Sequence, residues 1–141
     1  MSAIDTVSIL LVEDNPRDAE LTLRAFRKNN LANHILVARD GVEALEIVFS
    51  RASAERPRVI LLDLKLPKLD GLEVLRKLKS DERTRAIPVV VVTSSNQDPD
   101  IRTAYDLGAN SYVVKPVDFE SFMKTMSELG FYWLMVNQVP A

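Results

Sequence analysis

The stretch Val59-Ile60-Leu61-Leu62-Asp63 places an unbroken aliphatic run of strand length directly before a carboxylate. A strand buried on both faces of a sheet reads as a continuous apolar run, whereas a half-exposed strand alternates apolar and polar residues. Similar runs occur at Ile9 to Val12, Val89 to Val92 and Tyr112 to Val114, and a weaker one at Ile35 to Ala38. The sequence therefore predicts five buried strands.

Segments of helical length separate these runs, and each begins with a residue that suits a helix N-terminus. These residues are Asn15, Asp40, Asp70, Asp98 and Asp118. Their side-chain oxygens can accept hydrogen bonds from the first free amides of a helix. Strict alternation of strand and helix requires parallel strands joined by right-handed crossovers, with helices on both faces of the sheet. The predicted fold is α/β, with a doubly wound five-stranded parallel sheet.

The length of the chain sets its domain organisation. A chain of 141 residues is long enough for one ordinary domain and too short for two domains with a linker. We therefore expect one domain over residues 1–141, with a core of about 7–129 followed by an extended C-terminal helix and tail. No cysteine is present, which excludes a disulfide framework, a thiolate nucleophile and a sulfur-ligated metal.

Charge and hydropathy narrow the classes of partner. The formal net charge of −2 gives no general attraction to phosphate backbones, and no basic stripe with interleaved aromatic residues is visible. Nucleic acid is therefore not an expected partner. No apolar run is long enough to span a bilayer, and the N-terminal residues lack a basic start followed by an apolar stretch. We expect a cytoplasmic protein with no membrane partner.

Polar side chains follow four of the predicted strands. Glu13 and Asp14 follow the first, Asp63 the third, Thr93 the fourth and Lys115 the fifth. Because ligands of open α/β sheets bind beyond the carboxyl ends of the strands, these three acids, one hydroxyl and one ammonium should meet at one edge. Each residue alone has an ordinary explanation, as a polar strand end or a helix-capping loop. Their joint occurrence favours a functional site.

The chemistry of this set points to phosphoryl transfer. Three clustered carboxylates repel one another unless a cation offsets their charge, and Mg²⁺ prefers such oxygen ligands. A carboxylate can attack a phosphoryl donor to give an aspartyl phosphate, and we expect Asp63 to be that nucleophile. Lys115 would offset charge on the phosphoryl oxygens, and the Thr93 hydroxyl would donate a further hydrogen bond to them.

Four motifs resemble the receiver domain of two-component response regulators. They are Leu-Val-Glu-Asp-Asn at 11–15, Leu-Leu-Asp-Leu-Lys-Leu-Pro-Lys-Leu-Asp-Gly at 61–71, Val-Val-Thr-Ser-Ser at 91–95 and Ser-Tyr-Val-Val-Lys-Pro at 111–116. The resemblance extends over essentially the whole chain. It implies a flavodoxin-like receiver fold with strand order 2-1-3-4-5.

The resemblance also assigns roles to the residues at the strand ends. It implies that a partner histidine kinase phosphorylates Asp63, and that Lys115 contacts the phosphoryl group. Asp14 and Asp63 would bind Mg²⁺ directly, with Glu13 assisting through water. The backbone carbonyl of Lys65 would complete the protein ligands.

Two conformational features follow from the same resemblance. The Lys115-Pro116 peptide is expected to be cis. Thr93 and Tyr112 would form a switch pair: on phosphorylation the Thr93 hydroxyl moves toward a phosphoryl oxygen, the loop after the fourth strand follows, and Tyr112 turns inward into the vacated space.

A narrower resemblance is to the stand-alone receivers that serve phytochrome-type histidine kinases. It rests on Asn110-Ser111-Tyr112, on Val117-Asp118-Phe119 and on Leu-Gly-Phe-Tyr-Trp-Leu at 129–134. It implies a switch that signals through protein contacts without a DNA-binding output domain. The protein could regulate a target directly, or pass its phosphate to a histidine phosphotransfer protein, and the sequence leaves both open.

The resemblance also implies that Lys65 and Ser95 flank the site and govern how water approaches the acyl phosphate.

Two other functions compete with a signalling receiver: a hydrolase and a scaffold. A hydrolase of the haloacid dehalogenase type would carry a general acid two residues after its nucleophile, where this chain has Lys65. A pseudo-receiver scaffold would not need the intact set of strand-end residues. We therefore expect a signalling receiver rather than an enzyme, catalysing only its own phosphoryl transfer and autodephosphorylation.

The last predicted helix carries an apolar stripe at alternating four- and three-residue steps. It comprises Phe122, Met126, Leu129 and Trp133, continued by Val136. A narrow stripe of this spacing is typical of helix pairing, and exposed apolar surface often marks an interface. We expect a homodimer built around this helix and the adjacent fourth helix and fifth strand. The alternative is that the stripe packs in the core of the domain.

Overall fold

A computed structural model of the chain describes residues 8–28, 30 and 35–138. In this part of the chain, five parallel strands form one sheet of order β2-β1-β3-β4-β5. The strands are β1 (Ile9–Val12), β2 (Ile35–Ala38), β3 (Val59–Leu62), β4 (Val89–Thr93) and β5 (Ser111–Val114). The predicted sheet and strand order are confirmed, with β4 and β5 each one residue longer than the apolar run that predicted them.

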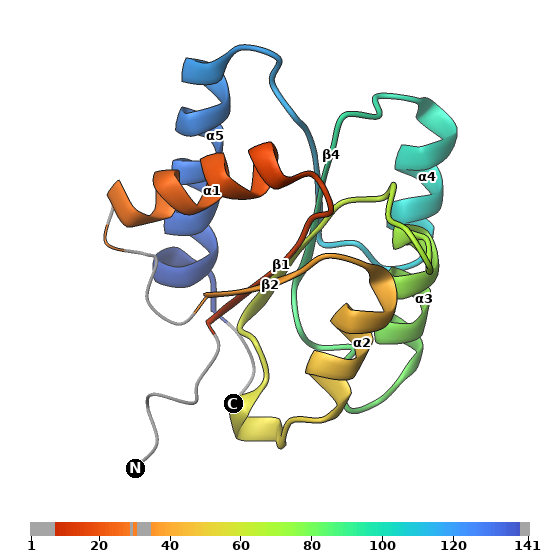
Figure 1. Cartoon of the computed structure of the whole chain (residues 1–141). Helices are drawn as coiled ribbons and strands as arrows, with labels where there is room; N and C mark the ends of the chain where they lie inside the picture. The colour runs from red at the N-terminus through yellow and green to blue at the C-terminus, as the bar shows by residue number, and fades with distance from the viewer. Residues whose placement is uncertain (1–7, 29, 31–34, 139–141) are drawn as a thin grey trace.

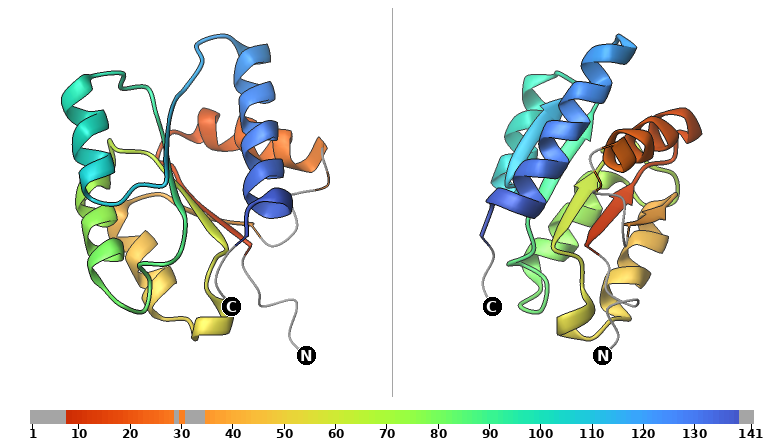
Figure 2. Two further views of the ribbon diagram at one scale, coloured as in Figure 1. Left: turned by 180° about the vertical axis from the view of Figure 1, so that it is seen from behind. Right: turned by 90° about the vertical axis from the view of Figure 1, so that its left-hand side faces the viewer.

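Helices cover both faces of the sheet (Figure 1). They are α1 (Pro16–Lys28), α2 (Gly41–Phe49), α3 (Gly71–Ser80), α4 (Asp98–Asp106) and α5 (Phe119–Phe131), with a short 3₁₀ helix η2 (Ser53–Glu55) and a π-helical turn η3 (Tyr132–Val136). Helices α1 and α5 lie side by side on one face, and α2, α3 and α4 cover the other, as the two views of Figure 2 also show. Among the described residues, no helix has the length and hydropathy needed to cross a bilayer.

The sheet divides the apolar core into two clusters, because successive side chains of a strand point to opposite faces. In β1, Ile9 and Leu11 join the cluster under α1 and α5, which also holds Phe26. Leu10 and Val12 join the cluster under α2, α3 and α4. All four β1 residues are buried, as the continuous aliphatic run predicts.

Side-chain caps fix the starts of most helices. The Asn15 carboxamide oxygen accepts hydrogen bonds from the Arg17 and Asp18 amides at 2.9 and 3.1 Å. Asp40 and Asp118 cap α2 and α5 in the predicted way. The predicted cap at Asp70 is wrong, since its side chain makes no capping bond, and Asp98 is the first residue of α4 rather than its cap.

Backbone contacts take the place of a cap at the start of α3. The Gly71 amide donates to the Leu64 carbonyl at 2.8 Å, so the loop that follows β3 occupies this helix end. A Cβ atom at position 71 would lie 2.3 Å from the Asp63 carbonyl oxygen and 2.5 Å from Leu64 Cα. Glycine therefore lets α3 approach the backbone that carries Asp63.

The predicted interface stripe on α5 lies inside the domain, so that prediction is corrected. Phe122, Met126 and Trp133 are only 5%, 1% and 9% exposed and belong to the core cluster under α1 and α5. Leu129 is partly buried against the same cluster. The physical reason is that α1 packs along α5, so the stripe forms its contacts within one chain. The alternative prediction, core packing, describes these four residues.

A different set of apolar side chains near the C-terminus is exposed. On the last residue of α5 and on η3, Phe131, Tyr132, Met135 and Val136 have 47–63% of their surface accessible. Trp133 lies between them in sequence and anchors the turn to the core. Val136, which continues the predicted stripe, is thus exposed, whereas the rest of the stripe is buried or partly buried.

Gly71→Ala should lower the free energy of unfolding by about 1–3 kcal/mol, the usual cost of overpacking. Alanine is favoured over glycine in helices by up to about 1 kcal/mol, so a loss would show that the contact with the Asp63 carbonyl dominates. Urea unfolding followed by circular dichroism measures the difference. Ser80→Ala, at the exposed end of the same helix, is the control and should change stability little. Equal or higher stability of Gly71→Ala would contradict the described packing.

Candidate functional site

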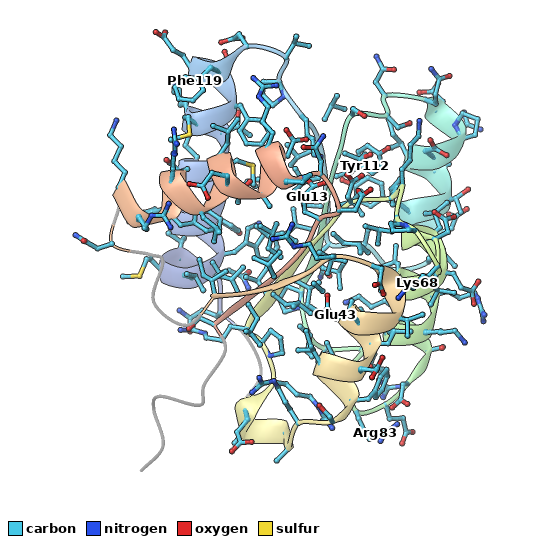
Figure 3. All side chains as sticks on the ribbon, in the orientation of Figure 1. Glu13, Glu43, Lys68, Arg83, Tyr112 and Phe119 are labelled. Carbon is cyan, nitrogen blue, oxygen red and sulfur yellow. The ribbon has the colours of Figure 1, made fainter. Side chains whose placement is uncertain are left out.

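The strand-end residues identified from the sequence meet at one edge of the sheet. Backbone hydrogen bonds continue the sheet ladder through them: the Asp63 amide donates to the Val12 carbonyl at 3.1 Å, and the Lys115 amide to the Thr93 carbonyl at 2.8 Å. The Glu13 amide donates to the carbonyl at the end of β2, at 2.9 Å. Because the ladder fixes their backbones, the side chains of these residues start from a rigid frame. In Figure 3, Glu13 and Tyr112 lie in the upper middle of the view, well above Arg83.

Lys115 is the centre of the site. Its Nζ atom donates to Glu13 Oε1 at 2.7 Å, to Asp18 Oδ2 at 2.9 Å and to Asp63 Oδ2 at 3.0 Å. An ammonium group has three protons, so these three carboxylates take all of its hydrogen-bonding capacity. The side chains of Lys115, Glu13 and Asp63 are each about nine-tenths or more removed from solvent.

Asp18 was not identified from the sequence, because it lies in α1 rather than at a strand end. It lies in the first turn of α1, which begins at Pro16, directly after the strand-end residues Glu13 and Asp14. The signal available in the sequence is this position: a helix that begins at the site edge carries its first-turn side chains toward the site. Asn15 reinforces the placement by accepting a hydrogen bond from the Asp18 amide.

The electrostatics of the buried pair follow from its surroundings. Burial raises the pKa of Glu13 to about 7, although its hydrogen bond to Lys115 acts in the opposite direction. Burial also disfavours the charged form of Lys115, but the hydrogen bonds to Glu13 and Asp18 outweigh it and raise the pKa of Lys115 above its ordinary value. Lys115 is therefore held as a cation at neutral pH.

The acidic residues offer a set of oxygen ligands for a divalent cation. One carboxylate oxygen from each of Glu13, Asp14 and Asp63 lies within 4.8 Å of the other two. Asp14 is exposed, so the set opens to solvent on one side. Carboxylates with room for water suit Mg²⁺ and similar hard ions. The Lys65 amide donates to Asp63 Oδ1 at 3.3 Å, which brings the Lys65 backbone to the same place.

The predicted switch residues meet at Ser95. Thr93 is fully buried, and its Oγ1 atom accepts a hydrogen bond from the Ser95 amide at 3.4 Å. The Tyr112 hydroxyl donates to the Ser95 carbonyl oxygen at 2.9 Å. Tyr112 is partly buried and packs against the core cluster under α2, α3 and α4.

The prediction of a cis peptide bond between Lys115 and Pro116 is wrong. The described peptide bonds are all trans, including this one. The trans isomer is the one that bonds before proline generally favour, by about 0.5–1 kcal/mol. Lys115 reaches its three carboxylates from this conformation.

Comparison with known proteins gives the same family from three directions. The family model for the response regulator receiver domain matches residues 9–127. The probable methanogenesis regulatory protein FilR2 of Methanothrix harundinacea is 46% identical over 142 residues, which cover 99% of this chain and 92% of that protein. Response regulator Rcp1 of Synechocystis is 35% identical, covering 94% of this chain and 92% of Rcp1.

Solved structures agree with the sequence matches. The phosphorylated cyanobacterial phytochrome response regulator RcpA superimposes with a TM-score of 0.89 at 36% identity, covering 96% of this chain and 99% of RcpA. The Mn²⁺-bound form of Rcp1 gives a TM-score of 0.87 at 34% identity, with the same coverage. Receiver domains bind a divalent metal, which suits the oxygen ligands of Glu13, Asp14 and Asp63. Fold, site and relatives thus agree, and the chain belongs to the response regulator receiver domain family.

Proposed function

We propose that this protein is a phosphorylation-activated signalling switch of a two-component system. It accepts a phosphoryl group from a partner histidine kinase onto Asp63, in a Mg²⁺-dependent reaction, and signals through protein contacts. The observation that supports this most directly is the 3.0 Å contact between Lys115 Nζ and Asp63 Oδ2, beside the carboxylates of Glu13 and Asp14. We assign the whole of residues 1–141 to this single receiver domain.

In the proposed reaction, an Asp63 carboxylate oxygen attacks the phosphorus of the kinase phosphohistidine. The new O–P bond forms as the P–N bond breaks, and the imidazole leaves with the electron pair. Glu13, Asp14 and Asp63 would hold Mg²⁺, with the Lys65 backbone carbonyl as a further ligand. When bound, the ion offsets the charge of these carboxylates and of the phosphoryl oxygens.

Lys115 supplies the positive charge that belongs to the chain itself. Its ammonium is already 3.0 Å from the attacking carboxylate, so the phosphoryl oxygens would arrive within its reach. Asp18 holds the same ammonium at 2.9 Å without belonging to the acidic triad. We propose that Asp18 keeps Lys115 in place when Asp63 becomes an acyl phosphate.

Thr93 and Tyr112 are the proposed switch pair. A buried hydroxyl at the end of β4 can turn toward a phosphoryl group on Asp63, at the end of the neighbouring strand β3. That movement would withdraw the acceptor of the Ser95 amide, and the loop after β4 would follow. Tyr112 would respond because its hydroxyl is bonded to the same loop.

The proposed partners follow from the family and from its named members. Membership of the receiver family implies a histidine kinase as phosphoryl donor. RcpA is described as a phytochrome response regulator, which supports a phytochrome-type kinase, whereas the name of FilR2 points to methanogenesis. The proposal includes two ways of passing the signal on: direct regulation of a target protein, and transfer of the phosphoryl group to a histidine phosphotransfer protein.

We also propose a homodimer, formed by the exposed C-terminal surface rather than by the buried stripe. This surface consists of Phe131, Tyr132, Met135 and Val136. Clustered large apolar side chains of this kind favour association, and two copies related by a twofold axis would present the same surface to each other.

Incubation with acetyl phosphate and Mg²⁺ should add one phosphoryl group, seen by intact mass, and Asp63→Asn should abolish it. The reason is that the carboxamide is not a nucleophile of comparable strength. Asp70→Asn, at the start of α3, is the control and should be phosphorylated normally. A wild-type chain that gains no phosphoryl group, or an Asp63→Asn chain that gains one, would overturn the assignment.

Asp18→Ala should slow phosphorylation by acetyl phosphate about tenfold, because Lys115 loses a charge-assisted hydrogen bond that positions it. Asp18→Asn retains an acceptor oxygen, so its phosphorylation rate should lie between those of the wild type and Asp18→Ala. Glu20→Ala, two residues further along α1, removes a carboxylate that pairs with Arg24 and Arg27, and is the matched control. Unchanged rates in Asp18→Ala would remove Asp18 from the mechanism.

Size-exclusion chromatography with light scattering should show a dimer, which Met135→Glu converts to a monomer. Met135 is 63% exposed, so its substitution places a charge on the proposed surface without disturbing the core. Val42→Glu, on exposed surface of α2, should leave the dimer intact. A monomeric wild-type chain at high concentration would contradict the proposal.

A further inference from the structure

Ser95 is a buried junction in the loop between β4 and α4. Only 9% of its surface is exposed, and its hydroxyl donates to Asp100 Oδ2 at 2.5 Å. The same hydroxyl oxygen lies 3.4 Å from the Gln97 amide, which donates to it. Both the donor and the acceptor of this side chain are therefore directed toward the beginning of α4, away from Thr93.

The backbone of Ser95 connects in the other direction. Its amide donates to Thr93 Oγ1 at 3.4 Å, and its carbonyl oxygen accepts from the Tyr112 hydroxyl at 2.9 Å. One residue thus joins both members of the proposed switch pair to Asp100. A displacement of Thr93 or Tyr112 moves the backbone of Ser95, and the side chain of Ser95 carries that displacement to α4.

Helix α4 is suited to respond to such a pull. Of its nine residues, all of them described, Ala104 alone is buried. An element with few buried apolar side chains opens or shifts at low free-energy cost. The bond to Asp100 lies in the first turn of the helix, where a carboxylate is also stabilised by the helix dipole. It is thus a polar tether on a helix that the core holds loosely.

A charged acceptor makes this tether stronger than an ordinary hydroxyl contact. Hydrogen bonds to an ionised group are shorter and about twice as strong as bonds between neutral groups. Asp98 lies in the same first turn but has no part in the contacts of Ser95 described above. The two acids therefore differ in their connection to Ser95 while sharing the helix end, which provides a matched pair for experiment.

We propose that Asp100 is a positioning residue that couples the state of Asp63 to the position of α4, through the side chain of Ser95. The proposal rests on the proposed function of Asp63 and Thr93. When the Thr93 hydroxyl turns toward a phosphoryl group, the Ser95 backbone follows, and the bond to Asp100 draws the first turn of α4 with it. The response of α4 then depends on this bond, whereas the attack of Asp63 on the phosphoryl donor does not use it.

The test is backbone hydrogen–deuterium exchange with and without Mg²⁺ and beryllium fluoride, which mimics the phosphoryl group. In the wild type, the additive should change exchange both in the peptide that contains Asp63 and in the peptide that spans α4. In Asp100→Ala, the change around Asp63 should persist, and the change in α4 should fall at least about threefold, as expected for loss of a charge-assisted bond. Asp98→Ala should retain both responses.

Ser95→Ala removes the same bond from its other end and should give the same loss at α4. The double variant should lose no more than either single variant, since both remove one interaction. Asp100→Asn keeps an acceptor oxygen and should recover part of the α4 response. A merely structural role of Asp100 would not produce this pattern, because it would alter α4 exchange equally with and without the additive.

The outcomes separate this inference from the function on which it rests. An α4 response that survives in both Asp100→Ala and Ser95→Ala, with the Asp63 response intact, overturns the inference and leaves the phosphorylation switch standing. If the wild type shows no response around Asp63, the proposed function fails and the inference fails with it. Because the two single variants alter different elements, a folding defect in one leaves the other to decide.

Discussion

The ammonium of Lys115 among the carboxylates of Glu13, Asp18 and Asp63 is the interaction on which the site depends. Buried carboxylates carry a large desolvation penalty, and their mutual repulsion adds to it. Three contacts of 2.7–3.0 Å with one cation offset part of this cost, and the rest raises the pKa of Glu13 to about 7. The same arrangement prepares the site for binding, because a divalent cation or a phosphoryl group would replace some of these contacts with its own.

The fold brings these groups together and fixes their positions. Glu13, Asp63 and Lys115 follow three different strands, and backbone hydrogen bonds extend the ladder through each of them. Gly71 allows α3 to approach the Asp63 backbone closely enough to brace it. By contrast, the loop after β4 is held mainly by polar contacts centred on Ser95, and α4 buries a single residue. A rigid chemical site is thus joined to a loosely held helix, as a switch requires.

The sequence was a good guide where one physical rule dominates. The fully buried strands β1, β3 and β4 correspond to continuous apolar runs, and the edge strands β2 and β5, although predicted, are only partly buried. The convergence of Glu13, Asp14, Asp63 and Lys115 follows from the strand ends. It was a poorer guide where two structures satisfy one pattern. The stripe through Phe122 and Met126 fits an interface or a core, and only the position of α1 decides between them. Asp18 was missed because its approach to Lys115 depends on the direction in which α1 leaves β1, and Asp70 was misjudged because a backbone contact at Gly71 replaced its cap.

The central claim is that Asp63 carries the phosphoryl group, and chemical trapping at that position tests it most directly. The phosphorylated chain would be reduced with borohydride, which converts an acyl phosphate to the corresponding alcohol, and then digested and sequenced by mass spectrometry. Homoserine is expected to replace aspartate at position 63 and at no other acidic residue. Homoserine at position 14 or 18, or none in a chain shown to carry phosphate, would contradict it.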